Sequence, residues 1–419
     1  MSFVLGVVLL TAALGVPLFV IMGLLALVAF SFAGVQTSAV AVEIYKMAAA
    51  PTLLSIPLFA FAGYLMAESG SPRRILRFAE AALGWLPGGV AIVSLVICAF
   101  FTAFTGASGV TIIALGGLLY PILKDKGFSD KFTLGLITTS GSLGLLFPPS
   151  LPLILYGLIG NVDIAQLFKA GLLPGILLIV LLSLWSLKNG SEILKTRIPF
   201  SAKELWDSFK GTAWEILLPI GVLGGIYGGI VTTTEAAALT ALYVFIIECF
   251  IYRDLKLTKD IPRIVGESMS LVGAILLILC CALGLTNYLV DEEVPMKLFA
   301  LMKTVIHDKY VFLLFLNIFL LIVGCLMDIF SAIVVVVPLI VPMAREYGVD
   351  PVHLAVIFLL NLEIGYVTPP VGINLFISSF RFQKPMVELY KASFPFLIIS
   401  ILALLIVTYV PWLSLVFIK

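Results

Sequence analysis

The chain has 419 residues, of which 61% are hydrophobic and 12% charged, with a formal net charge of +1. An ordinary soluble domain carries about 25% charged residues, so this composition indicates a polytopic helical membrane protein. No basic groove interleaves with exposed aromatic residues, which argues against nucleic acid as a partner. The five cysteines lie inside apolar runs without CxxC spacing, which argues against disulfides and a metal site.

The first part of the chain predicts membrane helices followed by a hairpin. Residues 2–34 are too long for one crossing of about 30 Å, and Gly15 with Pro17 divides them into two helices. Residues 52–68 cross next and end at a basic turn. Residues 88–123 are an apolar block with basic flanks on both sides and the polar stretch FTGASG at its centre. Like flanks predict a re-entrant hairpin whose tip stops inside the membrane.

The middle of the chain predicts a second set of crossings. Residues 132–160 form a crossing that is broken near its centre, and residues 172–187 return to a basic segment at 188–210. That segment has an amphipathic pattern typical of an arm on the cytoplasmic surface. Three further crossings are expected at 214–230, 235–252 and 264–290.

The last part repeats the arrangement of the first. Residues 310–344 form a second hairpin block, interrupted by CLMDIFSA and flanked by mixed or acidic charge. Residues 353–380 form a second broken helix, and residues 394–418 form the last crossing. Because basic loops alternate with loops poor in basic residues, the positive-inside rule predicts that the two hairpins enter from opposite faces.

A Pro-Pro pair lies inside each broken helix, in GLLFPPSLPLILY at 144–156 and GYVTPPVGINLF at 365–376. Proline removes a helical hydrogen bond and leaves carbonyls free, which the membrane interior tolerates only beside protein or a watery cavity. The two sequences keep a constant separation of 221 residues (144 to 365, 148 to 369). We therefore expect an inverted repeat with a transport site at the breaks.

The predicted fold is all-α, with two re-entrant hairpins and two Pro-Pro-broken helices. The expected domains are a first inverted repeat at 1–170, a linking span with the arm at 171–213, and a second inverted repeat at 214–419.

Polar residues deep in the apolar blocks have two interpretations each. Asp328 is a structural cap at the second hairpin tip, or it is a cation ligand or proton carrier. Thr105 and Ser108 bind a ligand, or they bond to a carbonyl of their own helix. Glu235, in TTTEAAA, is interpreted as a helix cap. Oxygen ligands at the tips suit Na⁺, and helix N-termini at the breaks suit an anionic substrate.

The motifs together resemble the large membrane subunit, of the DctM type, of tripartite ATP-independent periplasmic (TRAP) transporters. The resemblance runs almost end to end, through SIPLFAFAGYLM, FTGASG, LFPPSLPLILYG, GIVTTTEAAA, MDIFSA and YGVDPVHLAVIFLLNLEIGYVTPPVG. It implies an elevator-type, Na⁺-coupled importer of organic anions such as C4-dicarboxylates, in the bacterial inner membrane, that is not an enzyme and needs no cofactor. It also implies two partners, a small four-helix membrane subunit and a periplasmic substrate-binding protein.

The resemblance also implies site residues. The first Na⁺ site would use Thr105, Gly106, Ser108, Gly144 and Pro148. The second Na⁺ site would use Gly324, Asp328, Gly365, Thr368 and Pro369. The expected substrate-binding residues are Ser140, Ser142, Asn361 and Asn374. The sequence departs from the family in two motifs: TGASG stands where the family usually has SGSS, which weakens the first site, and TTTEAAA stands where it has PTEAAA.

Two other classes of function remain open. A one-component Na⁺/dicarboxylate symporter with a similar inverted repeat would lack the two partner proteins. A membrane-embedded enzyme or a non-transporting assembly subunit is the other alternative. An enzyme would need a convergent His, Cys or paired-carboxylate site, which the sequence does not supply.

Overall fold

The structure is a computed structural model that describes residues 15–418, except 35, 37, 39, 43, 44, 46–48, 87 and 191–199. The helix expected before Gly15 and part of the expected arm therefore lie outside the described residues. All regular secondary structure in the described part is helical. Eight helices there are long and apolar enough to cross a membrane, or nine if the bent pair Asp130–Leu146 and Leu151–Gly160 is one span.

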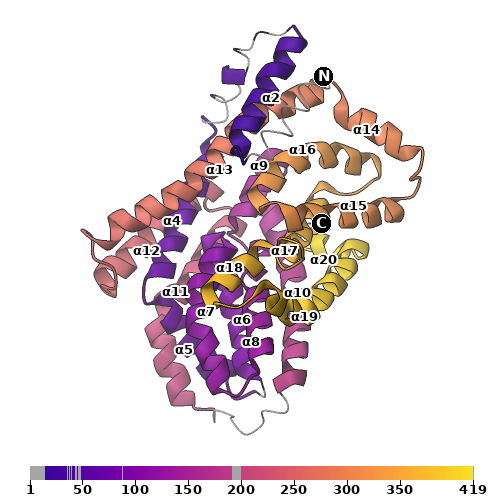
Figure 1. The fold of residues 1–419 in the computed structure, drawn as a ribbon. Coiled ribbons are helices and arrows are strands. Elements are labelled where there is room, and N and C mark those ends of the chain that lie inside the picture. The colour runs from indigo at the N-terminus through magenta and orange to yellow at the C-terminus, as the bar shows by residue number, and fades with distance from the viewer. Residues whose placement is uncertain are drawn as a thin grey trace.

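One group of helices forms a series of neighbours in which α2 contacts α13, α13 contacts α4, α4 contacts α12, and α12 contacts α11 (Figure 1). Helix α2 runs along α13, α12 runs along α4, and α5 runs along α11. The group consists of α2 (Leu18–Phe32), η1 (Pro51–Leu54), α4 (Ser55–Glu68), α5 (Ser71–Leu83), α11 (Ala202–Tyr227), α12 (Thr233–Ile246), the π-helical turn η4 (Ile247–Ile251) and α13 (Asp260–Asp291). Helix α14 (Val294–Lys303) follows α13 and packs mainly against the second group.

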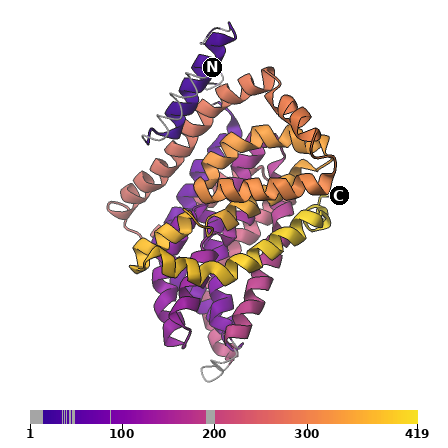
Figure 2. The ribbon, with the colours of Figure 1, turned by 45° about the vertical axis from the view of Figure 1, so that its right-hand side comes forward.

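The second group contains the two hairpins and the two broken helices. From the first half come α6 (Gly89–Thr105), α7 (Ser108–Asp125), α8 (Asp130–Ser140), η2 (Leu143–Leu146), α9 (Leu151–Gly160) and α10 (Ile164–Gly190). From the second half come α15 (Lys309–Leu326), α16 (Ile329–Glu346), α17 (Pro351–Gly365), α18 (Ile373–Phe382), α19 (Met386–Tyr409) and α20 (Trp412–Leu415). The orange and yellow helices of the second half lie against the purple helices of the first (Figure 2).

Each half contains a hairpin of two helices followed by a broken helix. In each half a hairpin of two helices is followed by a left-handed glycine, Gly127 or Gly348, and then by the broken helix. The broken helix starts with a side-chain cap in both halves, from Ser129 and from Asp350. Both Pro-Pro bonds are cis. Two helical hairpins and two broken helices are therefore present, while the re-entrant placement of the hairpins in the membrane and the opposite orientation of the two repeats stay predictions.

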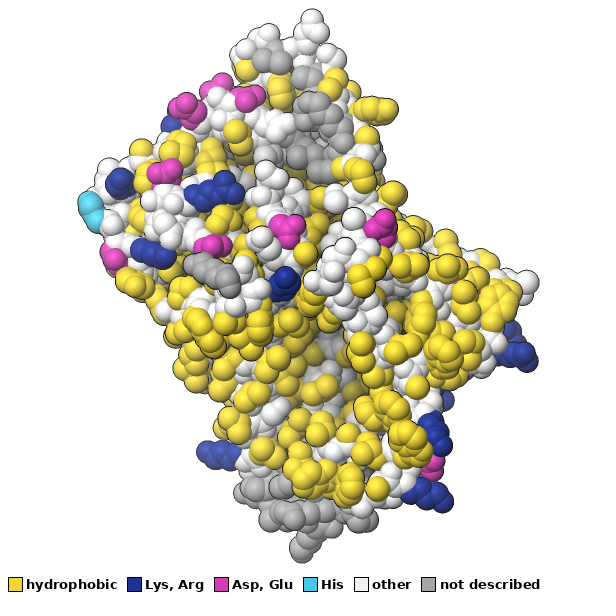
Figure 3. All heavy atoms as spheres, turned by 180° about the vertical axis from the view of Figure 1, so that it is seen from behind, with side chains coloured by type: hydrophobic (Ala, Val, Ile, Leu, Met, Phe, Trp, Pro, Cys, Tyr) yellow, Lys and Arg dark blue, Asp and Glu magenta, His cyan; other side chains and the backbone are white. Residues whose placement is uncertain are grey.

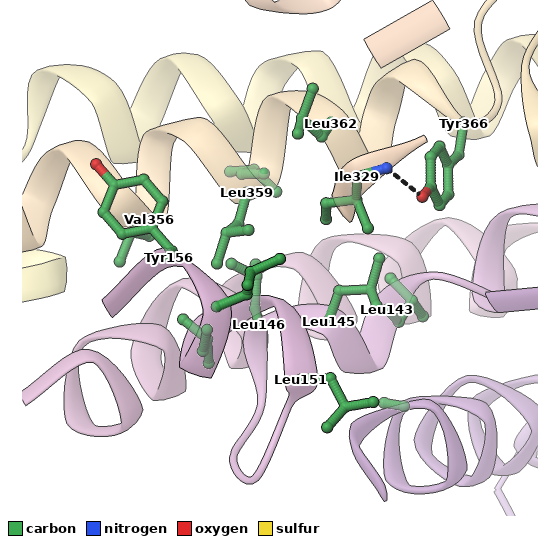
Figure 4. Close-up of a cluster of buried hydrophobic side chains, with 14 of the residues drawn as sticks. Leu143, Leu145, Leu146, Leu151, Tyr156, Ile329, Val356, Leu359, Leu362 and Tyr366 are labelled. Atoms are coloured by element: carbon green, nitrogen blue, oxygen red, sulfur yellow. Dashed lines mark hydrogen bonds between the residues drawn. The ribbon is translucent and has the colours of Figure 1, made fainter. Parts of the chain in front are cut away.

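The two broken helices share a core of large apolar side chains (Figure 4). Leu143, Leu145 and Leu146 of the first break lie beside α17, which carries Leu359 and Leu362. All five side chains are buried. Because burial of an aliphatic side chain contributes about 1.5–3 kcal/mol, this contact holds the two breaks together as one body.

Polar contacts also join the two halves. Asn374 Nδ2 donates to the carbonyl of Thr138 over 3.1 Å, and the hydroxyls of Thr138 and Ser378 lie 2.9 Å apart. Lys384 Nζ lies 2.8 Å from a carboxylate oxygen of Asp130. Since each contact crosses from one half to the other, the hairpin and broken-helix group is a single packed unit.

Three elements differ from the sequence-based expectation. The expected basic turn at residues 73–77 is part of the amphipathic helix α5, and α14 was not predicted. The expected arm and the following crossing are continuous in the described part, because α11 runs from Ala202 to Tyr227 without a break. Amphipathic helices of this kind carry too few apolar residues for a hydropathy window to find them.

The surface carries the pattern of a membrane protein. A broad field of hydrophobic side chains crosses the middle of the molecule, and charged side chains gather toward its ends (Figure 3). Among the large apolar side chains that are at least half exposed are Leu217, Ile220, Leu239, Leu242 and Phe315. Exposed apolar surface of this extent requires a lipid environment.

Candidate functional site

The turns of both hairpins reach one cavity of about 300 Å³, which we call the tip cavity. The first tip (residues 105–109) joins α6 to α7, and the second tip (residues 327–331) joins α15 to α16. Helix α13 closes the opposite side. The lining residues are Gly106, Ala107, Ser108, Gly109, Leu271, Ala274, Ile275, Ile278, Asp328, Phe330, Tyr366, Ile373 and Ile377.

Two larger cavities lie elsewhere and contain no residue of either tip. One of about 400 Å³ lies between α11 and α12 and is lined almost entirely by apolar side chains. The other, of about 470 Å³, lies beside Asn161, Asp163 and Thr232. The tip cavity is therefore the one that the repeated motifs of the sequence point to.

The first tip is fixed against the first Pro-Pro break. Gly106 adopts φ +63°, which favours glycine, and a Cβ there would meet the side chain of Leu151. Thr102 Oγ1 lies 2.8 Å from the carbonyl oxygen of Gly141. A Cβ at Gly144 would overlap the backbone of α6 at Ala99. Gly106 of the first tip and the end of α6 thus pack against the segment between Gly141 and Leu151, which contains Gly144 and Pro148 of the first predicted Na⁺ set.

The second tip is fixed against the second break in the same way. A Cβ at Gly365 would overlap the backbone of Gly324, and the amide of Gly372 donates to the carbonyl of Cys325 over 3.2 Å. The amide of Ile329 donates to the hydroxyl oxygen of Tyr366 over 2.8 Å. Gly324 and Gly365, two members of the second predicted Na⁺ set, therefore lie in contact.

Asp328 caps the N-terminus of α16. Its Oδ1 accepts hydrogen bonds from the amides of Phe330 and Ser331, each over 3.0 Å, and Oδ2 accepts one from the hydroxyl of Ser331. The structure thus confirms that Asp328 is a helix cap. A carboxylate has about four lone-pair positions, so the cap leaves room for a cation as well.

The oxygen atoms near the second tip suit a hard cation. Na⁺ takes oxygen ligands, and the carboxylate of Asp328 faces the tip cavity beside a helix break. The hydroxyl of Thr368, by contrast, donates to the carbonyl of Ile364 over 2.8 Å. At the first tip the hydroxyl of Thr105 lies 3.4 Å from the carbonyl of Ala107. Cation binding by these residues stays a prediction.

The four residues expected to bind substrate do not line the tip cavity. The hydroxyls of Ser140 and Ser142 donate to carbonyls of their own segment, those of Ile137 and Thr139. Asn361 Nδ2 lies 2.7 Å from Asn317 Oδ1, and Asn374 binds Thr138 as described above. The structure places all four inside the packed unit, and their contact with substrate stays a prediction.

The α13 wall of the tip cavity was not predicted from the sequence. Leu271, Ala274, Ile275 and Ile278 follow the spacing i, i+3, i+4, i+7, which places them on one face of a helix. The spacing is readable in the sequence, but every residue of this helix segment is apolar or small. The pattern therefore gave no reason to choose this face over another.

Two glutamates, Glu235 and Glu363, differ in their hydrogen-bond partners. Thr232 and Glu235 form a capping box at the start of α12, which confirms the predicted cap. Glu363, one turn before the second Pro-Pro pair, is 3% exposed, and neither of its carboxyl oxygens has a partner among the described residues.

A charged network joins α5, α11 and η4, the turn that follows α12. The guanidinium of Arg74 contacts Glu215, Glu248 and Asp254, at 2.8 Å for Glu248, and lies 3.6 Å from the centre of the Tyr252 ring. Burial alone would lower the pKa of Arg74, but its hydrogen bonds to Asp254 and Glu215 outweigh burial and raise it. Arg74 is therefore charged and holds three helices at one point.

The chain is similar in sequence to known proteins. The family described as "Tripartite ATP-independent periplasmic transporter, DctM component" matches residues 5–413. The isethionate TRAP transporter permease protein DctMQ of Oleidesulfovibrio alaskensis is 35% identical over 410 residues, which are 96% of this chain and 64% of that relative. The C4-dicarboxylate TRAP transporter large permease protein DctM of Vibrio cholerae is 36% identical over 87% of this chain and 84% of its own length.

A solved structure has the same fold. The crystal structure of the Alcanivorax borkumensis YdaH transporter matches with a TM-score of 0.58 and 13% identity, over 89% of this chain and 87% of that one. At this identity the match concerns the fold alone.

Proposed function

The chain belongs to the DctM family of tripartite ATP-independent periplasmic transporters, and from this premise we propose that it imports small organic anions together with Na⁺. As a large permease subunit it is a multi-pass protein of the bacterial inner membrane and not an enzyme. The observation that supports the proposal most is the tip cavity, because two pseudo-equivalent hairpin tips meet there.

The hairpin and broken-helix group is proposed to carry the substrate past α13. Its two halves are joined by the leucine core and by contacts such as that of Asn374 with Thr138. The group that contains α13, α11 and α12 is proposed to stay fixed. The division into inverted repeats at 1–170 and 214–419, with a linking segment at 171–213, is part of the proposal and allows the same unit to face either side.

Two Na⁺ ions are proposed to bind at the contacts between tips and breaks. The first would use Thr105, Gly106, Ser108, Gly144 and Pro148, and the second Gly324, Asp328, Gly365, Thr368 and Pro369. The support is that each tip packs against its own break and presents oxygen atoms there. Na⁺ would supply positive charge for an anion in a cavity that no described Lys, Arg or His lines.

The substrate is proposed to be a carboxylate. A relative named for C4-dicarboxylates supports a carboxylate, and a relative named for isethionate, a sulfonate, supports an organic anion more generally. A small four-helix membrane subunit and a periplasmic binding protein are proposed as partners on the basis of family membership. The hairpin and broken-helix group contains four further residues that are proposed to bind the substrate: Ser140, Ser142, Asn361 and Asn374.

Uptake into proteoliposomes tests the proposal. The chain would be reconstituted with its small subunit, with the cognate binding protein and labelled substrate outside, with and without an inward Na⁺ gradient. Uptake that needs both the binding protein and Na⁺ is the expected result. Uptake with Na⁺ but without the binding protein would favour the one-component symporter, and uptake that is independent of Na⁺ would reject the coupling.

A further inference from the structure

We propose that Arg381, at the end of α18, is an anion-binding residue outside the tip cavity, and that it receives the organic anion as the anion leaves the cavity toward the cytoplasm. The inference rests on the proposed function, because it concerns the path of the same substrate. It names a residue that lies outside the repeated motifs and the tip cavity, and it follows from the contact between α7 and α18.

The contact between α7 and α18 begins at the tip cavity and ends at Arg381. Gly109 of α7 and Ile377 of α18 both line the cavity, and a Cβ at Gly109 would lie 2.8 Å from the side chain of Ile377. About two turns farther along α7, a Cβ at Gly117 would overlap Nη2 of Arg381. Arg381 follows Ile377 by four residues, so both lie on one face of α18. The same pair of helices thus leads from the cavity to the guanidinium.

The guanidinium of Arg381 is held by the backbone and not by a carboxylate. Its Nε donates to the carbonyl oxygen of Ile113 over 3.0 Å, and the described part of the chain gives it no ion pair. The acidic residues Asp130 and Glu388 contact Lys384 instead, at 2.8 and 3.4 Å. The N–H groups of Nη1 and Nη2 are therefore available to an anion, and their fork geometry matches the two oxygens of a carboxylate.

Helix α13 has an exposed face that continues from the tip cavity in the same direction. Ala274 lines the cavity, and Ser270 and Glu267 precede it by four and seven residues, so the three share one face of α13. All three side chains are exposed, as is that of Ile113 on α7. The start of α13 and the end of α18 both carry basic residues, which the positive-inside rule assigns to the cytoplasm. An anion that leaves the cavity in this direction passes exposed faces of α13 and α7.

Arg381 adds a positive charge that the tip cavity lacks. No described Lys, Arg or His lines the cavity, so an anion there depends on Na⁺ for its counter-charge. Na⁺ leaves together with the anion, whereas a guanidinium keeps its charge and its place in the protein. A positive charge beside apolar walls raises the local concentration of anions. Arg381 therefore favours movement of the anion out of the cavity along α7 and α18.

A cysteine beside Arg381 tests anion binding with a probe that does not depend on the transported substrate. Ile113→Cys is placed in a chain whose native cysteines are replaced by alanine. The thiol of the purified protein is modified with 2-sulfonatoethyl methanethiosulfonate, a small organic anion, and with the neutral 2-hydroxyethyl analogue. The ratio of the two rates reports the local preference for an anion, because the reactivity of the thiol itself cancels.

Arg381→Gln should lower this rate ratio about tenfold, and Arg381→Lys should lower it less. Arg253→Gln is the matched control, because Arg253 is also exposed and its Nε also donates to a backbone carbonyl, that of Phe250, but it lies in the group that contains α13. Arg253→Gln should leave the ratio unchanged. An unchanged ratio in Arg381→Gln would overturn the inference, and so would a thiol that reacts with neither reagent, since water would then not reach Arg381.

Competition shows whether Arg381 binds anions or only attracts them. Isethionate shares the sulfonatoethyl group of the reagent, and it should slow the anionic reagent more than sodium chloride of equal ionic strength does. The extra slowing should disappear in Arg381→Gln. Equal slowing by isethionate and sodium chloride would reduce Arg381 to a screened surface charge and would overturn the binding site.

A cysteine in the tip cavity tests the path. Ala274→Cys replaces a residue that lines the cavity, and the anionic reagent should reach it past Arg381. Arg381→Gln should therefore lower the rate ratio at this position too, in the same direction and by a smaller factor. A ratio at Ala274→Cys that does not depend on Arg381 would show that anions reach the cavity by another path.

The two proposals fail in different ways. If Na⁺-gradient uptake requires Na⁺ and the rate ratios do not depend on Arg381, the proposed function stands and Arg381 is not on the path. If uptake shows no dependence on Na⁺, the proposed coupling is rejected, while the rate ratios still decide whether Arg381 binds an organic anion.

Discussion

Gly324 of the second hairpin and Gly365 of the second broken helix are in backbone contact, so that a Cβ on Gly365 would overlap the backbone of Gly324. This contact fixes the second tip beside its break, and it explains why both positions carry glycine.

Gly365→Ala should therefore destabilise the hairpin and broken-helix group by about 1–3 kcal/mol, the usual cost of overpacking. The expected result is a lower Tm of the detergent-solubilised protein and reduced uptake. Gly211→Ala is the matched control, because a Cβ at Gly211 would meet nothing within 4 Å in helix α11. An unchanged Tm for Gly365→Ala would show that the two segments separate readily and that the contact does not fix the tip.

Asp328→Asn should weaken the dependence of uptake on Na⁺ while the protein stays folded. Asparagine keeps an oxygen that can accept from the amides of Phe330 and Ser331, but it loses the charge that would attract Na⁺. Asp350→Asn is the control, because Asp350 caps α17 through the amide of Val352 at 2.9 Å and does not line the tip cavity. Wild-type Na⁺ affinity in Asp328→Asn would remove Asp328 from the cation site.

Arg74→Ala should be strongly destabilising, by about 3–5 kcal/mol, because it leaves Glu215 and Glu248 buried without their cation. Arg74→Lys should restore little of this stability, since one ammonium cannot reproduce three directed contacts. The measurement is the Tm of each variant. Arg77→Ala serves as the control: Arg77 pairs with Glu204 on the exposed surface, where a small change is expected. Equal effects of Arg74→Ala and Arg77→Ala would contradict the structural role of the network.

Ala274→Leu should reduce uptake by about an order of magnitude with little change in Tm. Ala274 is exposed on α13 and lines the tip cavity, so a larger side chain there occupies substrate space rather than core. Val265→Leu enlarges a 39% exposed residue of the same helix away from the cavity, and it should transport normally. Normal uptake by Ala274→Leu would place the substrate elsewhere.

Much of the fold could be predicted from the sequence. The FTGASG and CLMDIFSA stretches mark the two hairpin turns, and the Pro-Pro pairs mark the two breaks, because each interrupts an apolar block at a definite position. Helices α5 and α14 could not be predicted from hydropathy, since amphipathic helices lack a long apolar window.

The site was less predictable than the fold. Ser140 and Asn361 stand beside the breaks in the sequence, yet the face of a helix that meets a cavity depends on tertiary packing, which local spacing does not determine. The apolar wall of α13 comes from a helix distant in the chain and carries no polar residue that would mark it. The second tip needs hydrogen-bond partners, such as Tyr366 for the amide of Ile329, that only a folded chain supplies.

The most direct test of the account is a reversible cross-link between the moving unit and α13. Ala107 of the first tip and Ala274 of α13 line the same cavity, so cysteines at both positions, in a chain whose native cysteines are replaced by alanine, can be joined by a bifunctional thiol reagent. If the hairpin unit carries substrate past α13, a cleavable cross-link should abolish Na⁺-driven uptake, and reductant should restore it, while each single cysteine variant treated alike stays active. Wild-type uptake by the fully cross-linked protein would contradict movement of the tips relative to α13.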